Sequence, residues 1–172
     1  APPARGHGCA EAEELAQQLY AVQSITDPAL TRLPLEELLR ELLLRIRDLL
    51  AADTATLLLL SEDGQSLVAR ASVGLEEEVQ ERLRMPVGYG IAGNILAQRQ
   101  GAIIDDIAAA HPANPLLARR LRSLVGVPLM AAGRAFGVVH AGSTHLGHFT
   151  PHHLGLLQLV ADRAALIIEN AR

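Results

Sequence analysis

The sequence contains no lysine and no tryptophan, and its 172 residues include only one cysteine, two tyrosines and two phenylalanines. A single thiol, Cys9, excludes an internal disulfide bond and a cysteine-based metal site. No stretch of 18 apolar residues occurs, so we predict no membrane-spanning helix in this segment and expect a cytoplasmic protein. The net charge is −4, and the one basic cluster is Arg119, Arg120 and Arg122. Nucleic acid is therefore not an expected partner.

Aliphatic residues dominate what is present. Apolar residues make up 49% of the chain, and because aromatic residues are so few, the core must be built from Leu, Val, Ile and Ala. A chain of this length is about the size of one domain. We expect a flexible leader over residues 1–9, an N-terminal signalling or dimerisation helix with its linker over 10–33, and a globular domain over 34–172.

Two helices are predicted before the first strand. In residues 10–26 apolar side chains recur at steps of three and four along a narrow face, until Asp27-Pro28 ends the helix. A second helix starts with Pro34 in its first turn and carries a wide apolar face as far as Leu50. The wide face is predicted to be core. The narrow face has less to pack against within one domain and is the better candidate for a dimer contact.

After residue 53 the apolar pattern becomes that of strands. A buried run and an alternating run flank the turn Glu62-Asp63-Gly64, which predicts a hairpin over residues 54–61 and 66–73. A second hairpin is predicted over residues 124–131 and 135–143, and a short strand over 102–104. Small helices are predicted over 76–84, 91–98 and 116–122. The sequence therefore predicts an α+β fold. The first and last helices cover one face of an antiparallel sheet, and short helices and loops cover a pocket on the other face.

The last predicted helix begins at Thr150-Pro151, where threonine can cap the helix and proline fits its first turn. A heptad-like apolar seam runs along it from Leu154 to Ala171, either as core or as a second candidate dimer contact. The helical pattern continues unbroken through residues 167–172, with no Gly or Asn break. We therefore expect the helix to lead into an output domain of the same polypeptide.

Four motifs follow one another in the middle of the chain: the glycine loop Gly88–Gly93, the pair Asp105-Asp106, and the apolar runs 124–129 and 136–142. They supply no nucleophile with its base and no phosphate-binding lysine, so we expect no enzyme activity. The glycines are predicted to allow a tight turn over the sheet. The adjacent aspartates are predicted to cap a loop and not to act as an acid–base pair.

The histidines have different predicted roles. His140 lies in a buried strand, either as a core histidine bonded to the backbone or as a polar anchor directed into the pocket. His148 and His152 could meet across one helical turn, but no carboxylate is near, so capping and surface roles are expected and no metal. Arg119, Arg120 and Arg122 are predicted to form a mostly solvated face, from which one of them could reach an anionic ligand. The residues expected to line the pocket are Tyr89, Gly90, Ile91, Asp105, Asp106, His111, Leu116, Arg119 and His140.

These motifs and their order resemble a GAF domain over roughly Leu35 to Arg172. The resemblance rests on the glycine loop, the aspartate pair, and the segments Ser123–Leu129, Gly137-Val-Val, Phe149–Pro151 and 157–172. The C-terminal part is especially similar to bacterial GAF modules of sporulation-type and sigma-control serine/threonine phosphatases, and to those of histidine kinases. The resemblance implies a GAF/PAS-like sensory fold, often dimeric, that binds an unknown small molecule or serves as a ligand-free dimerisation scaffold.

Comparison with better-defined members of that family narrows the range of expected ligands. Cyclic-nucleotide-binding members carry a signature lysine, bilin-binding members a thioether cysteine, and the free-methionine-sulfoxide reductases several cysteines, none of which this chain matches. Some actinobacterial members bind haem through a histidine in a segment similar to Asp105–Pro112, which makes His111 the candidate haem ligand here. The shortage of aromatic residues and the short loop count against haem. The cofactor is otherwise unknown, and none is expected to be obligatory.

Overall fold

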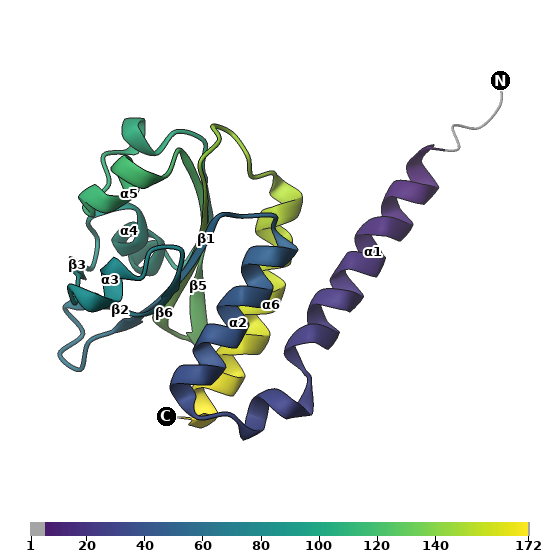
Figure 1. Cartoon of the computed structure of the whole chain (residues 1–172), viewed down its shortest axis with the longest axis horizontal. Coiled ribbons are helices and arrows are strands. Elements are labelled where there is room, and N and C mark those ends of the chain that lie inside the picture. The colour runs from purple at the N-terminus through teal and green to yellow at the C-terminus, as the bar shows by residue number, and fades with distance from the viewer. Residues whose placement is uncertain (1–5, 172) are drawn as a thin grey trace.

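The computed structural model describes the backbone of residues 6–171 and the side chains of residues 11–23 and 25–171. Figure 1 shows the arrangement of helices and strands. The helices span Gly6–Ile25 (α1), Pro28–Arg32 (η1), Leu35–Leu49 (α2), Glu77–Gln80 (α3), Gly90–Gln98 (α4), Ile107–Ala110 (η2), Pro115–Arg120 (α5) and Pro151–Ala171 (α6). The strands span Thr54–Leu60 (β1), Ser66–Val73 (β2), Arg84–Pro86 (β3), Ala102–Ile104 (β4), Ser123–Ala131 (β5) and Arg134–Ser143 (β6).

The six strands form one sheet in the order β3-β2-β1-β6-β5-β4, and every neighbouring pair is antiparallel. The two predicted hairpins are present, and β1 of the first pairs with β6 of the second at the centre of the sheet. Irregular register at Leu57/Leu58 and at Leu129/Met130 shifts the alternation of side chains in both hairpins. The predicted α+β architecture is confirmed.

Helices α2 and α6 lie side by side on one face of the sheet, the helical face (Figure 1). The core there is aliphatic, with Leu39, Leu43 and Leu157 fully buried against strand residues such as Val139. Helix α6 packs along β5, and α1 packs mainly on α6. Since most of the α6 seam is buried in this core, at Leu157, Ala161, Ala164 and Ile168, the interpretation of that seam as a dimer contact is wrong.

The opposite face of the sheet lies under α3, α4, η2 and α5, which together we call the roof (Figure 1). A second apolar cluster fills the space between sheet and roof. Its members come from short helices and from strands, and include Leu58, Ile91, Ile95, Ile107, Leu116, Leu117, Leu121 and Val138. The predicted two-sided arrangement is therefore present, but the helix beside α6 on the sheet is α2, whereas the first helix, α1, packs mainly on α6.

Two helices, α1 and α3, differ most from the sequence predictions. Helix α1 begins at Gly6 instead of Ala10, while residues 1–5 of the expected leader lie outside the described part of the chain. The acidic helix expected over 76–84 is a single turn, α3, because Arg82 takes a positive φ of 51°. The chain then pairs with β2 as the edge strand β3. Sheet pairing has here overridden local helix propensity.

The start of α6 confirms the predicted cap. Thr150 Oγ1 accepts a hydrogen bond from the backbone N–H of His153 (3.4 Å), and His153 Nδ1 accepts one from the N–H of Thr150 (3.1 Å). This is a capping box in which histidine takes the usual place of glutamate.

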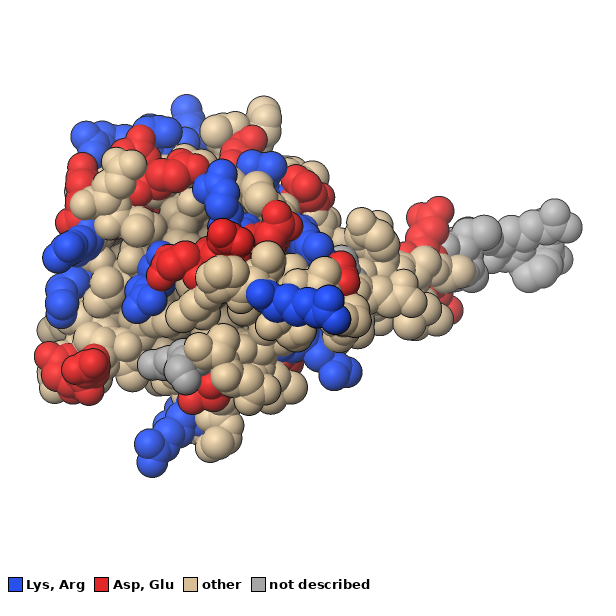
Figure 2. All heavy atoms as spheres, turned by 60° about the horizontal axis from the view of Figure 1, so that its bottom comes forward, with Lys and Arg blue, Asp and Glu red and all other residues tan. Residues whose placement is uncertain are grey.

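The surface and the helices add two observations. On the face shown in Figure 2, acidic side chains lie among the arginines. Among the described helices, none is both long and apolar enough to cross a bilayer.

Candidate ligand site between the sheet and the roof

A row of polar side chains crosses the sheet beneath the roof. Ser72, Thr56 and His140 are in register on the neighbouring strands β2, β1 and β6, and all three are buried. The hydroxyls of Thr56 and Ser72 are hydrogen-bonded to each other at 2.8 Å. Burying polar groups is unfavourable unless they are paired. This row of buried polar side chains distinguishes the roof face from the apolar cluster beneath α2 and α6.

His140 is the unsatisfied member of the row. Its Nδ1 is buried and has no hydrogen-bond partner among the described residues. Burial lowers the pKa of His140 from 6.5 to about 4, so the imidazole is neutral near pH 7. A neutral imidazole can donate one hydrogen bond and accept another, but brings no charge to the site.

A cleft of about 140 Å³ opens between α4 and β4. Its lining is apolar inside and carries amides at the rim, and consists of Gly90, Ile91, Asn94, Ile95, Gln98, Gln100, Ala102, Ile104 and Ala110. Pockets that enclose small ligands usually measure ~300–1,000 Å³. The cleft as it stands admits only a few heavy atoms, and a larger ligand requires the roof to move.

One side chain separates the cleft from His140. Gly126 stands opposite His140 on β5, and a Cβ at Gly126 would lie 2.8 Å from Cδ1 of Ile95 and 3.2 Å from Cβ of His140. The tip of Ile95, which lines the cleft, thus occupies the space that the missing side chain leaves beside the imidazole. A rotation of Ile95 would extend the cleft toward His140.

The glycine loop fixes the roof over this site. Gly88 and Gly90 adopt positive φ angles of 87° and 71°, which favour glycine. A Cβ at Gly90 would lie 2.6 Å from the Cβ of Ala113, so the loop before α5 rests directly on the start of α4. The glycines serve a tight turn and close packing, as the sequence predicts.

A buried polar contact joins α3 to α5. Asn114 Nδ2 donates to Glu78 Oε1 at 3.1 Å, while Asn114 Oδ1 accepts from the backbone N–H of Leu116 at 3.0 Å and caps α5. Outside it, Glu77 and Arg120 form an ion pair at 3.2 Å. The roof is thus held by polar contacts as well as by apolar packing.

The structure brings together some of the expected pocket residues and separates others. Gly90 and Ile91 line the cleft, and His140 lies beneath it. Leu116 is buried in the roof cluster. The remaining members are all exposed, namely Tyr89 (68%), Asp105, Asp106, His111 and Arg119. Asp106 caps η2 through the N–H of Ala108 at 3.2 Å, the loop-capping role predicted for it.

Sequence reasoning missed the rim amides and the pair at the α3–α5 contact. Glu78 stands three residues after the buried Leu75, at the spacing of about one helical turn, where an apolar residue would be usual. Asn114-Pro115 has the same cap-plus-proline form as Thr150-Pro151. Both signals are present in the sequence. Asn94, Gln98 and Gln100 carry no such signal, because exposed amides are common on any helix.

The histidines near α6 have structural partners. His152 Nε2 contacts Gln17 Oε1 of α1 at 2.5 Å, and His148 Nε2 contacts the carbonyl of Leu50 at 3.3 Å. No group of three or more potential metal ligands occurs among the described residues. His111 is exposed in a left-handed conformation, beside a cleft far too small for a porphyrin, so its surroundings do not fit haem.

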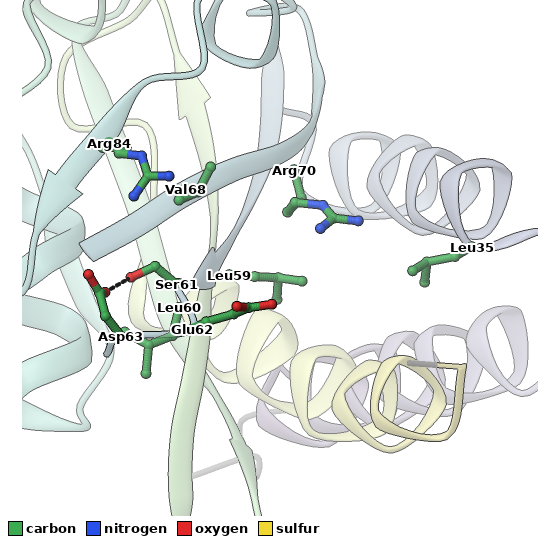
Figure 3. Close-up of a pocket in the computed structure, with 9 residues that line it drawn as sticks. All are labelled: Leu35, Leu59, Leu60, Ser61, Glu62, Asp63, Val68, Arg70 and Arg84. Carbon is green, nitrogen blue, oxygen red and sulfur yellow. Dashed lines mark hydrogen bonds between the residues drawn. The ribbon is translucent and has the colours of Figure 1, made fainter. Parts of the chain in front are cut away.

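A wider open cleft of about 540 Å³ lies on the helical side of the sheet, between the start of α2 and the β1–β2 turn (Figure 3). Arg70 and Arg84 line one wall, and Glu62 and Asp63 line the turn side. Arg70 already pairs with Glu36 at 3.3 Å, and Asp63 Oδ1 accepts from Ser61 Oγ and from the N–H of Gln65. The charges therefore stabilise the turn and α2 and leave no buried polar group unpaired there.

The sequence matches the GAF domain family over residues 32–169. This chain belongs to the GAF family. GAF domains are sensory and regulatory modules of signalling proteins, and the architecture of this GAF domain agrees with that membership. No curated protein matches it by sequence.

Solved structures share its fold. The GAF domain of a phosphoenolpyruvate-protein phosphotransferase (ptsP) from Coxiella burnetii is 21% identical, with a TM-score of 0.77 over 92% of this chain and 94% of that one. The A. aeolicus nlh2 GAF domain in an inactive state is 15% identical, with a TM-score of 0.72 over 94% and 99%. Free methionine-R-sulfoxide reductase from Neisseria meningitidis, in complex with its substrate, is 21% identical, with a TM-score of 0.69 over 92% and 87%. Such identities establish the fold alone.

Proposed function

We propose that this GAF domain is a non-enzymatic sensory module of a bacterial signalling protein. A small ligand enters the cleft between α4 and β4, displaces Ile95 and hydrogen-bonds to His140. The observation that carries this proposal is the unpaired Nδ1 of a fully buried imidazole, one side chain away from an open cleft. Retaining such a group costs stability, which a packing role alone does not explain.

The chemistry of the site limits the ligand. His140 is neutral, the cleft interior is aliphatic, and the rim carries amides. We infer a small, largely apolar ligand with one hydrogen-bonding group directed at the imidazole. Arg119 is exposed and outside the cleft, so an anionic group is not part of this proposal.

A path from the cleft to the terminal helices supports the signalling role. Gln100 and Ala102 line the cleft, and a Cβ at Gly101 between them would lie 2.9 Å from Cδ1 of Leu154 on α6. One turn of α6 also contacts α1 through His152 and Gln17. A shift of β4 on ligand binding therefore moves the start of α6, and α1 with it. Such coupling needs a ligand whose affinity differs between two helix arrangements.

The terminal helices are the proposed route to a homodimer mate and to an output domain, a phosphatase or a histidine kinase. Leu15 and Leu19 lie one turn apart on α1 and are 59% and 58% exposed. They form the exposed end of the narrow face singled out in the sequence, whose other end, Ile25, is buried in the core. The exposure of Leu15 and Leu19 favours this end of α1 over the buried seam of α6 as the dimer contact.

A thermal-shift screen against nucleotides, amino acids, aromatic metabolites and haem tests the sensory role. We expect at least one compound to raise the Tm of the wild type and to leave the Tm of the His140→Leu variant unchanged. Leucine fills about the same space as histidine but has no hydrogen-bonding group. His145→Gln, on an exposed histidine of the same domain, is the control and should respond as the wild type does. A flat screen supports the alternative function, a ligand-free dimerisation scaffold.

A further inference from the structure

Glu78 is buried without a counter-ion. Its side chain is fully shielded from solvent, its Oε1 accepts the single hydrogen bond from Asn114, and its Oε2 is buried with no partner among the described residues. An ionised carboxylate in this position has lost its hydration and received one amide hydrogen bond in return. A protonated carboxyl group is far less costly to bury.

The charged groups of the surrounding elements are engaged elsewhere or exposed. On α3 itself, Glu77 pairs with Arg120 of α5 and adds a like charge beside Glu78. Arg70 of β2 pairs with Glu36 of α2. The side chains of Arg119 on α5 and His111 in the preceding loop are exposed. Among the described residues, Glu78 takes part in no salt bridge.

Asn114 connects Glu78 to the moving part of the roof. It caps α5, whose Leu116 and Leu117 pack over the sheet, and its neighbour Ala113 rests on Gly90 at the start of α4. Loss of the Glu78–Asn114 contact would therefore release the N-terminus of α5 and the loop that covers α4.

We propose that Glu78 and Asn114 form a proton-dependent clasp, which holds the roof closed while the Glu78 carboxyl is protonated and loosens when it ionises. The regulation of access to the ligand site by this clasp rests on the proposed function. The control of roof opening by the clasp is independent of that function.

The change falls near neutral pH. Burial is the main cause that raises the pKa of Glu78 from 4.5 to about 7, opposed by the Asn114 hydrogen bond and reinforced by Glu77. The carboxyl thus keeps its proton longer in the closed roof than in the open one. The stability that Glu78 contributes to the closed roof is therefore fully present below pH 4.5 and is lost as the pH rises through about 7.

Native-state hydrogen exchange tests the clasp without any ligand. The measured quantity is the ratio of exchange rates, wild type over Glu78→Gln, for amides of residues 107–122 at the same pH, so that intrinsic exchange chemistry cancels. We expect this ratio to rise at least about tenfold between pH 5 and pH 8, because one proton is linked to opening across the window. Amides of α2 should show a smaller rise, and Glu81→Gln, at an exposed position of the same segment, should follow the wild type.

A ratio that does not change with pH overturns the clasp. Should Glu78→Gln fail to fold, a ¹³C NMR titration of the Glu78 carboxyl in the wild-type protein decides: a midpoint near 7 supports the clasp and one near 4.5 overturns it. If these experiments support the clasp but no compound raises the Tm in the thermal-shift screen, the ligand site is refuted and roof opening remains under proton control.

Discussion

The two faces of the sheet are built from the same aliphatic residues but differ in what lies among them. Against α2 and α6 the packing is largely apolar, with Leu39, Leu43 and Leu157 fully buried. Beneath the roof, the apolar cluster is interrupted by His140, Glu78 and a row of hydroxyls. One face is optimised for packing, whereas the other keeps polar groups whose burial is unfavourable.

The difference assigns separate roles to the two faces. The helical face joins two long helices to the central strands and has no evident alternative packing. The roof consists of helices of nine residues or fewer, held by a glycine turn and the Asn114 contact. Short elements with few partners open at lower free energy than the core. We therefore place the conformational change in the roof and its transmission in α6.

Breaking the helical face should have the largest effect. Leu157→Ala removes a fully buried side chain from the α6–sheet contact and is expected to lower the free energy of unfolding by about 2–5 kcal/mol. Urea denaturation measures this loss. The matched control is Leu166→Ala on the same helix, which is 57% exposed and should change stability by ~0.5 kcal/mol or less. Equal losses at both positions would contradict the assignment of the faces of α6.

Two buried groups of the roof face should make the free energy of unfolding depend on pH in opposite directions. Burial raises the pKa of Glu78 to about 7 and lowers the pKa of His140 to about 4. The stability contributed by Glu78 is therefore lost as the pH rises from 4.5 through 7. The stability contributed by His140 is present above 6.5 and lost as the pH falls through 4. In the wild type these two trends oppose each other between pH 4.5 and 6.5.

Single variants should separate the two trends. Relative to the wild type, Glu78→Gln should gain stability with rising pH across this window, and His140→Leu should lose it, each by at most about 1.4 kcal/mol per pH unit. Urea denaturation at several pH values measures both slopes. Parallel curves for the wild type and both variants would mean that neither group is buried as described.

Much of this contrast could be read from the sequence, and the part that could not has physical causes. The spacing of apolar residues and the positions of turn and capping residues were sufficient to predict both hairpins, α2 and the cap at Thr150, because these signals are local. The edge strand β3 was missed because pairing with β2 is a long-range contact that the acidic residues before it do not reveal. His140 was left open between core residue and anchor, and its unpaired nitrogen became visible only with its neighbours in place.

The structure brings together only some of the pocket residues expected from the motifs, for a related reason. Asp105, Asp106 and His111 follow one another in sequence beside β4, but the chain turns them to solvent at η2. Ile95 and the rim amides take their place at the cleft. Proximity along a loop does not determine which side chains face inward, since that depends on the packing of the roof.

Two glycine substitutions should sharpen the comparison with opposite signs. Gly126→Ala directs a methyl group at the tip of Ile95, beside His140, and should destabilise the domain by ~1 kcal/mol as Ile95 is displaced. Gly155→Ala, in α6 on the opposite side of the sheet, meets no atom within 4 Å and should stabilise by ~0.5–1 kcal/mol through helix propensity. Thermal denaturation distinguishes the two. Stabilisation by both would show that Ile95 does not occupy the space over Gly126.

The smallest effect on stability is expected on α1. Leu19→Glu changes a side chain that is 58% exposed and should leave the free energy of unfolding within ~0.5 kcal/mol. If α1 forms the proposed dimer contact, light scattering coupled to size-exclusion chromatography should show a shift from dimer to monomer. An unchanged mass would remove α1 as the interface.

The claim that the roof opens independently of the helical face is tested most directly by native-state hydrogen exchange of the wild-type domain at low urea concentrations. We predict that amides of residues 90–98 and 107–122 exchange through an opening of lower free energy and weaker urea dependence than amides of α2 and α6. A single free energy and a single urea dependence for both faces would show that roof and helical core unfold together, and would contradict the account.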